Sequence, residues 1–113
     1  QWEWKGGDNQ KWRIESVGDG YYRLVSKYSG KVLDIGGPSA ENGAGAIQWE
    51  WKGGDNQKWR IESVGDGYYR LVSKYSGKVL DIGGPSAENG AGAIQWEWKG
   101  GDNQKFRLEA LTE

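Results

Sequence analysis

The stretch GGDNQKW at residues 53–59 decides how this chain is interpreted. The same letters stand at residues 6–12, and they return at 100–106 with phenylalanine in the last place. The spacing is 47 residues each time, and residues 1–47 are repeated letter for letter at 48–94. A fixed period of this length indicates a fold built from repeated supersecondary units. Perfect identity between the copies indicates a designed or consensus-built sequence, with a recent gene duplication as the alternative.

The composition argues against several classes of function. The 113 residues carry a net charge of −1 and contain neither histidine nor cysteine. This charge gives no electrostatic reason to expect nucleic acid or an anionic membrane as a partner. No apolar run approaches the roughly 20 residues that membrane insertion requires. The commonest general base and the thiolate metal ligands are lacking, so we expect no metal site and no cofactor.

Each repeat is expected to contain four strands. Segments 21–27 and 31–36 flank a short YSG turn and predict a first hairpin. Segments 46–51 and 57–63 predict a second hairpin across KGGDN, where Gly-Gly-Asp suits positive φ. The stretch 37–45 joins the two hairpins as a loop. No window shows a sustained 3.6-residue apolar period, so helix is not expected. Four strands per unit fit either a propeller blade or a β-trefoil.

The Gln-x-Trp triplet that ends the repeated stretch separates these two architectures. In its setting after GGDN it resembles the signature of the ricin-type β-trefoil lectin family. The resemblance extends through GYYRLVSKYSGKVLDI at 20–35 and NGAGAIQWEWKGGDNQKW at 42–59, and it covers essentially the whole chain. It implies an all-β β-trefoil in which three four-strand units form a barrel. It also implies that Trp12, Trp59 and Phe106 are core residues around the pseudo-threefold axis.

In the family's usual phase, the chain divides into a half unit, 1–18, and two full units, 19–65 and 66–113, within the single domain 1–113. Three units of 47 residues would comprise 141 residues, 28 more than the chain has. We therefore expect a trefoil that lacks its first hairpin and has about ten of twelve strands. Unpaired strand edges invite association. A homo-oligomer or a complementary fragment is expected to cover this gap.

The resemblance also implies sugar-binding residues. In the family, one unit supplies an Asp after its second strand, an aromatic residue on its third strand and an Asn before Gln-x-Trp, with the adjacent Gln bracing the Asp. The matching residues are Asp34, Trp49, Asn56 and Gln57 in one unit, and Asp81, Trp96, Asn103 and Gln104 in the next. A third, incomplete site has Trp2, Asn9 and Gln10 but no Asp.

Strand alternation bears on how these side chains are presented. Asp34 is opposite in phase to Leu33 and Ile35, so we expect it on an exposed face. Trp49 and Trp51 share a strand face by the same rule, and the sequence alone does not say which ring meets sugar. Trp49 is preferred because it occupies the family's aromatic position, whereas Trp51 stands where the family often has cysteine.

These features favour non-catalytic carbohydrate binding, with galactose-type sugars as the expected ligands. Sugars offer hydroxyls for hydrogen bonds and C–H patches that lie against aromatic rings. Glycoside hydrolysis needs a distinct pair of carboxylates, and the repeated acidic residues here provide no uniquely placed pair. The serines have no histidine partner. The alternative is a designed, self-assembling scaffold without a functional ligand.

Overall fold

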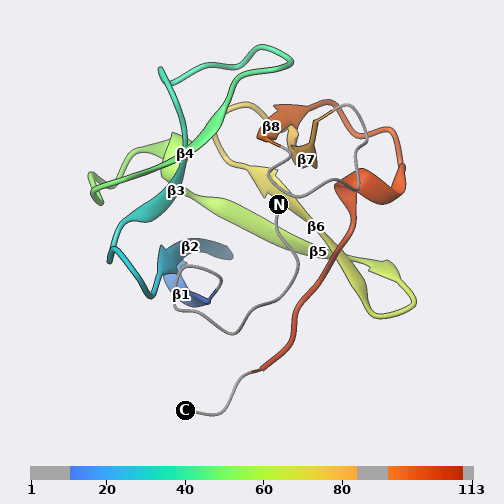
Figure 1. The fold of residues 1–113 in the computed structure, drawn as a ribbon, viewed down its shortest axis with the longest axis horizontal. Helices are drawn as coiled ribbons and strands as arrows, with labels where there is room; N and C mark the ends of the chain where they lie inside the picture. The colour runs from blue at the N-terminus through green and yellow to red at the C-terminus, as the bar shows by residue number, and fades with distance from the viewer. Residues whose placement is uncertain (1–10, 84–91, 111–113) are drawn as a thin grey trace.

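The structure is a computed structural model, and it describes residues 11–83 and 92–110. These residues form an all-β molecule with two single-turn 3-10 helices (Figure 1). Residues 1–4, which repeat the last four residues of the predicted strand 46–51, lie outside the described residues. The strands are β1 (Trp12–Gly18), β2 (Tyr21–Ser26), β3 (Val32–Ile35), β4 (Ala46–Trp49), β5 (Trp59–Gly65), β6 (Tyr68–Ser73), β7 (Val79–Ile82), β8 (Ala93–Trp96) and β9 (Phe106–Arg107). The 3-10 helices are η2 (Asp55–Gln57) and η3 (Asp102–Gln104). No helix among the described residues has the length and apolar character needed to cross a membrane.

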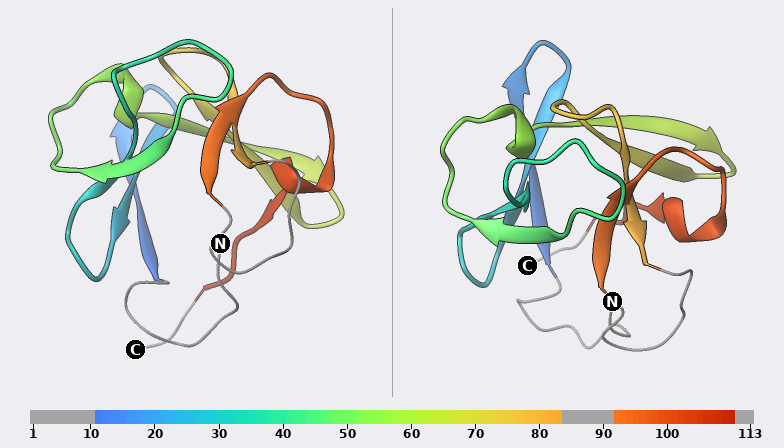
Figure 2. Two further views of the ribbon diagram at one scale, coloured as in Figure 1. Left: turned by 45° about the horizontal axis from the view of Figure 1, so that its top comes forward. Right: turned by 90° about the horizontal axis from the view of Figure 1, so that it is seen from above.

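The nine strands of the described residues belong to one antiparallel sheet. Its main path runs β4-β3-β2-β5-β6-β7-β8, with β1 added on β2 and β9 added on β6. The β1–β2 and β5–β6 hairpins project in different directions from the body of the molecule (Figure 2). The same pairing pattern recurs along the chain because the same sequence recurs. The all-β prediction is confirmed.

The strand pairing differs from the one expected from the sequence. β2 pairs along its length with β1, across a tight turn in which Gly18, Asp19 and Gly20 all have positive φ. Its pairing with β3 is limited to Val25 opposite Val32, so the first predicted hairpin forms only at its closed end. The second predicted hairpin, 46–51 with 57–63, is wrong. β4 pairs with β3 instead, because the segment between β4 and β5 contains η2 rather than a tight strand turn.

The core is built around Trp59. Its ring is fully buried, and it packs with Leu24, Ile35, Leu71 and Leu80. Its Nε1 donates a hydrogen bond to the carbonyl oxygen of residue 33 on β3, at 3.3 Å. This side chain therefore joins β5 to the preceding copy of the β2–β3 segment.

The other two residues at this position of the repeat differ from Trp59. Phe106 is partly buried against the same core, as its predicted role requires. Trp12 is 45% exposed, so its predicted core position is wrong. The physical reason is that Trp59 lies under β2 and β3, with Tyr22 opposite it, whereas no segment covers Trp12 in the same way within the described residues.

We expect Trp59→Ala to lower the free energy of unfolding by about 3–5 kcal/mol, because it removes a fully buried ring. The matched variant is Trp12→Ala, which changes the same letter in the same local sequence. Since Trp12 is half exposed, its loss is expected to cost much less. Denaturant unfolding of both variants measures the difference. Equal losses would show that Trp12 is also a core residue in solution.

Candidate functional site

A hollow of about 330 Å³ lies where β3, β4 and the segment leading to η2 meet. It contains an acid, an aromatic ring and an amide from three parts of one repeat. The residues that matter for its chemistry are Asp34, Pro38, Trp49, Lys52, Asn56 and Gln57. The structure therefore brings together all four residues that the sequence predicted for the first site. Pro38 and Lys52 were not predicted. The only indication in the sequence that Pro38 and Lys52 would line this hollow was that they follow Asp34 and Trp49 closely along the chain.

Asp34 is buried, contrary to the exposed position expected from strand alternation. Only 5% of it is accessible. Asn56 Nδ2 donates to its Oδ1 at 3.1 Å, and Gln57 Nε2 donates to its Oδ2 at 2.8 Å. The alternation rule fails here because η2 folds over this face of β3 and brings both amides to the carboxylate. The carboxylate still lines the hollow.

Gln57 also organises the segment that carries it. Its Oε1 accepts hydrogen bonds from the backbone N–H groups of Lys52 and Gly53, at 2.8 and 3.1 Å. Its Nε2 donates to the carbonyl oxygen of Glu50 at 2.8 Å, in addition to the bond with Asp34. One buried side chain thus closes the turn around itself and fixes the carboxylate. Buried polar groups with complete partners of this kind specify a single local structure.

The two glycines before η2 are required by the same arrangement. Gly53 has φ of +77°, in the region that favours glycine. A Cβ atom at Gly54 would lie 2.6 Å from Oδ1 of Asn56, closer than any normal contact. The residues of the segment GGDNQ therefore act together, because the glycines allow the amides of Asn56 and Gln57 to reach Asp34.

The second copy repeats this geometry. Asn103 Nδ2 and Gln104 Nε2 donate to the two carboxylate oxygens of Asp81, each at 2.9 Å. The Gln104 Oε1 atom accepts from the backbone N–H groups of Lys99 and Gly100, at 2.8 and 3.2 Å. Trp96 stands on β8 as Trp49 stands on β4. The structure therefore also groups Asp81, Asn103 and Gln104 as predicted. The residues of the third predicted site, Trp2, Asn9 and Gln10, lie outside the described residues.

Trp49 and Trp51 have different surroundings. Trp49 ends β4, lines the hollow and is 53% exposed. Trp51 lies beyond the strand, where the guanidinium of Arg23 stacks over its ring at 5.0 Å from the centroid. The second copy repeats this contact between Arg70 and Trp98, at 4.9 Å. The period-two argument that placed both rings on one face does not apply, because β4 ends before Trp51.

Ion pairs near the Asp34 and Asp81 clusters keep one acidic side chain charged in each repeat. Lys52 Nζ lies 2.8 Å from Glu50 Oε1. The hydrogen bond and the positive charge of Lys52, with a smaller contribution from Lys31, lower the pKa of Glu50. Lys99 lowers the pKa of Glu97 in the same way. Among the described residues, no three acidic side chains gather closely enough to hold a metal ion.

We expect Gln57→Ala to lower the free energy of unfolding by about 3 kcal/mol, because it leaves a buried carboxylate oxygen and two backbone N–H groups without partners. Gln48→Ala is the matched control, since Gln48 is exposed and its loss should change stability little. Thermal or denaturant unfolding measures both. If the two variants are equally stable, Gln57 does not brace the turn.

Comparison with known proteins places this geometry in a family. The family described as ricin-type beta-trefoil lectin domain-like matches residues 1–49 and 55–113. The chain belongs to the ricin-type β-trefoil lectin-like family. Membership, together with the lectins among its structural neighbours, supports carbohydrate binding as the general function. The predicted β-trefoil fold is confirmed.

Three solved structures illustrate the likeness. A designed 3-fold symmetric protein, ThreeFoil, is 51% identical with a TM-score of 0.96, over 98% of this chain and 79% of that one. The exo-beta-1,3-galactanase 1,3Gal43A from Clostridium thermocellum is 39% identical with a TM-score of 0.95, over 98% of this chain but 24% of the galactanase. A Polyporus squamosus lectin bound to the epitope Neu5Aca2-6Galb1-4GlcNAc is 29% identical with a TM-score of 0.71, over 83% of this chain and 33% of the lectin. No curated protein matches the chain.

Proposed function

We propose that this chain binds galactose-type sugars without catalysis, through the hollow at Asp34 and Trp49 and through the matching residues Asp81 and Trp96. The observation that carries the proposal is the pairing of a half-exposed indole ring with a buried carboxylate whose oxygens are both held in place by amides. Such a pair offers the two kinds of contact that a sugar ring requires.

The carboxylate is suited to receive sugar hydroxyls. Each oxygen of an ionised carboxylate has lone pairs for more than one donor. Asn56 and Gln57 each supply one donor to Asp34, so acceptor capacity remains on the side that faces the hollow. Because the amides fix the orientation of the carboxylate, binding a sugar requires little reorganisation of the protein.

The indole ring is suited to receive the apolar face of the sugar. A galactose-type ring has an axial hydroxyl that leaves one face with a continuous patch of C–H groups. In the proposed complex this patch lies on Trp49, and paired hydroxyls reach Asp34 and Asn56. Similarity to a galactanase and to a lectin bound to a galactose-containing epitope supports this class of sugar.

Sugar hydrolysis is less well supported than sugar binding. Hydrolysis of a glycosidic bond needs two carboxyl groups on opposite sides of the bond, about 5–9 Å apart. Of the described residues that line the hollow, Asp34 is the single carboxylate. A second candidate function is a self-assembling scaffold without a ligand. Similarity to a designed symmetric protein supports this alternative.

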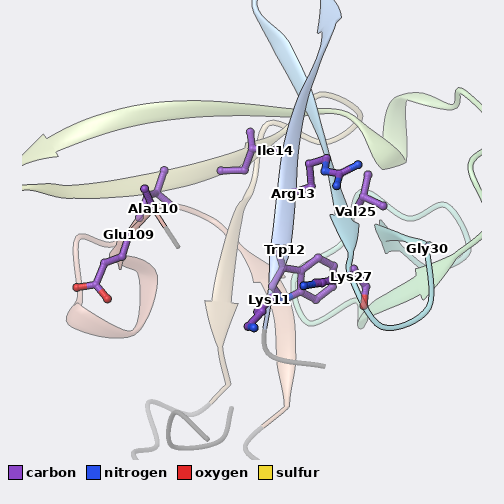
Figure 3. A pocket seen from close by; sticks show the side chains of 11 residues that line it. Lys11, Trp12, Arg13, Ile14, Val25, Lys27, Gly30, Glu109 and Ala110 are labelled. Atoms are coloured by element: carbon purple, nitrogen blue, oxygen red, sulfur yellow. The ribbon is translucent and has the colours of Figure 1, made fainter. Parts of the chain in front are cut away.

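We also propose that the chain is one domain, composed of a half unit, 1–18, and the full units 19–65 and 66–113. A second proposal is that another polypeptide segment covers the exposed apolar surface beside β1. A hollow of about 590 Å³ lies beside β1 (Figure 3). Figure 3 shows Trp12 and Ile14 on β1, together with Glu109 and Ala110, among the residues that line this hollow. Trp12, Ile14 and Leu108 are all exposed there. A second copy of the chain or a complementary fragment would bury this apolar surface.

Calorimetric titration with lactose tests the sugar proposal. We expect saturable binding in the millimolar range or tighter, at the Asp34 and Asp81 sites. The double variant Asp34→Asn with Asp81→Asn should abolish it, because each change replaces a hydroxyl-accepting oxygen with an amide donor. The matched control is Asp55→Asn with Asp102→Asn, which alters the same residue type at the start of η2 and η3.

Two outcomes would contradict the proposal in different ways. Full affinity in the Asp34→Asn, Asp81→Asn double variant would remove both carboxylates from the site. A wild-type chain that binds neither lactose nor any sugar on a broad glycan array would support the scaffold alternative.

A further inference from the structure

Two identical strands of this chain have different surroundings. Gln95 on β8 is completely buried, whereas Gln48, at the same position of β4, is exposed. Gln95 Nε2 donates to the carbonyl oxygens of Ser39 and Glu41, each at 2.8 Å. Its backbone exchanges hydrogen bonds with the same loop, accepting from Gly43 at 2.8 Å and donating to residue 44 at 2.9 Å. The loop between β3 and β4 thus docks on the edge of β8 in the next repeat.

The docked loop also restrains the aromatic residue of the second site. Asn42 Oδ1 accepts a hydrogen bond from the backbone N–H of Glu97 at 3.0 Å. A Cβ atom at Gly43 would lie 3.8 Å from the ring of Trp96, so the loop lies beside the ring. Trp96 is half-buried as a result, whereas Trp49 is 53% exposed. The two sites therefore share a sequence but differ in how far the aromatic ring is buried.

Strands β2 and β3, which precede this loop in the chain, cover β5, the strand that begins with the tryptophan of the second Gln-x-Trp triplet. Trp59 lies opposite Tyr22 and donates its indole hydrogen bond to β3. Arg60 stacks on Tyr21 at 5.0 Å and donates to its hydroxyl at 3.1 Å. Arg107 and Tyr68 repeat this contact one unit later, at 4.8 and 3.1 Å.

The first copy of this strand carries the same letters, but no described residue covers it in this way. Trp12 is half-exposed, and the side chain of Arg13 is 71% exposed, against 49% for Arg60. Arg13 reaches Glu15 at 3.6 Å, as Arg60 reaches Glu62 at 3.8 Å. The copies therefore differ in the contacts that residues 19–47 make with Trp59 and Arg60.

Two surfaces lack this cover among the described residues, one at Trp12 on β1 and one at Gln48 on β4. A single segment could contact both of them. Residues 19–47 touch Trp59 with their strands and Gln95 with their loop. Trp12 and Gln48 lie one repeat of 47 residues before Trp59 and Gln95. A segment of the same sequence, placed one repeat earlier in the fold, would reach both surfaces at once.

We propose that a polypeptide segment with the sequence of residues 19–47 docks on both surfaces together, and that its docking raises the sugar affinity of the Asp34 site. The second half of this inference rests on the proposed function. The tyrosine of the docked segment stacks on Arg13, and its β3 carbonyl accepts from Trp12. Its loop pairs with β4 and lies beside Trp49, as residues 39–44 lie beside Trp96.

The coupling has a simple physical origin. Within the described residues β4 pairs with one strand, β3. Binding a sugar on Trp49 must therefore also restrict the motion of that strand and ring. A docked loop already restricts the strand and the ring before the sugar binds. Sugar binding then loses less conformational entropy, so more of the contact energy appears as affinity. The Asp81 site, whose loop is already in place, is therefore the tighter site in the chain alone.

A synthetic peptide of residues 19–47 tests the docking. Mixed with the chain, it is expected to form a one-to-one complex by light scattering. It should also slow hydrogen exchange of the Trp12 indole N–H by about tenfold or more, toward the rate of Trp59. Gln48→Ala in the chain and Asn42→Ala in the peptide should each weaken the complex. A peptide with the same residues in scrambled order is the control.

Lactose titration of the complex tests the coupling. The chain carries Asp81→Asn, so that lactose binding is measured at the Asp34 site alone. The peptide carries Asp34→Ala, so that it adds no sugar-binding carboxylate of its own. The peptide is expected to raise lactose affinity about tenfold, the factor that corresponds to 1.4 kcal/mol. An unchanged affinity with the peptide bound would overturn the coupling.

The remaining outcomes are distinct. If the peptide fails to bind a monomeric chain, the docking is wrong. If the chain is already a dimer that the peptide neither dissociates nor enlarges, a second copy occupies the surface and the docking proposal is again overturned. If light scattering and indole exchange show the peptide bound but lactose binds nowhere in the wild-type chain, the docking is supported. The proposed function and the coupling then both fail.

Discussion

The hydrogen bonds from the amide of Gln57 to Asp34 and from the backbone to Gln57 are the interaction on which most of this structure depends. They link β3, the end of β4 and η2 through one buried side chain. An unpaired buried carboxylate would be costly, so closing the turn around it stabilises this part of the fold. The same bonds leave the carboxylate oriented at the rim of a hollow beside Trp49. Folding and the proposed sugar site are thus two consequences of one arrangement.

Repetition of sequence does not produce repetition of environment. Trp59 and Trp12 have identical neighbours in the sequence, yet one is in the core and the other is half exposed. Gln95 and Gln48 differ in the same way. In each pair the buried member is covered by residues 19–47, and the exposed member has no such cover among the described residues. The units of this fold are therefore completed by their neighbours, through the Arg60–Tyr21 contact and the loop at 39–44.

Much of this could be predicted from the sequence, for reasons that particular residues make clear. The grouping of Asp34, Trp49, Asn56 and Gln57 followed from the resemblance to the ricin-type family, because this chain has the same residue types at the same spacing. Burial of Asp34 could not be predicted from alternation, since that rule treats a strand face as open unless another element is known to cover it. The pairing of β4 with β3 was missed because strand propensity does not identify a partner. The exposure of Trp12 depends on a contact from another repeat, which local sequence does not encode.

The central claim is that a sugar lies on Trp49 and Trp96 and hydrogen-bonds to the neighbouring carboxylates. A two-dimensional NMR titration that follows the indole N–H signals of the chain during lactose addition tests it most directly. The account predicts saturable shifts for Trp49 and Trp96, with the signal of the buried Trp59 unchanged. Shifts confined to Trp51 and Trp98, or no saturable shift of any indole signal, would contradict it.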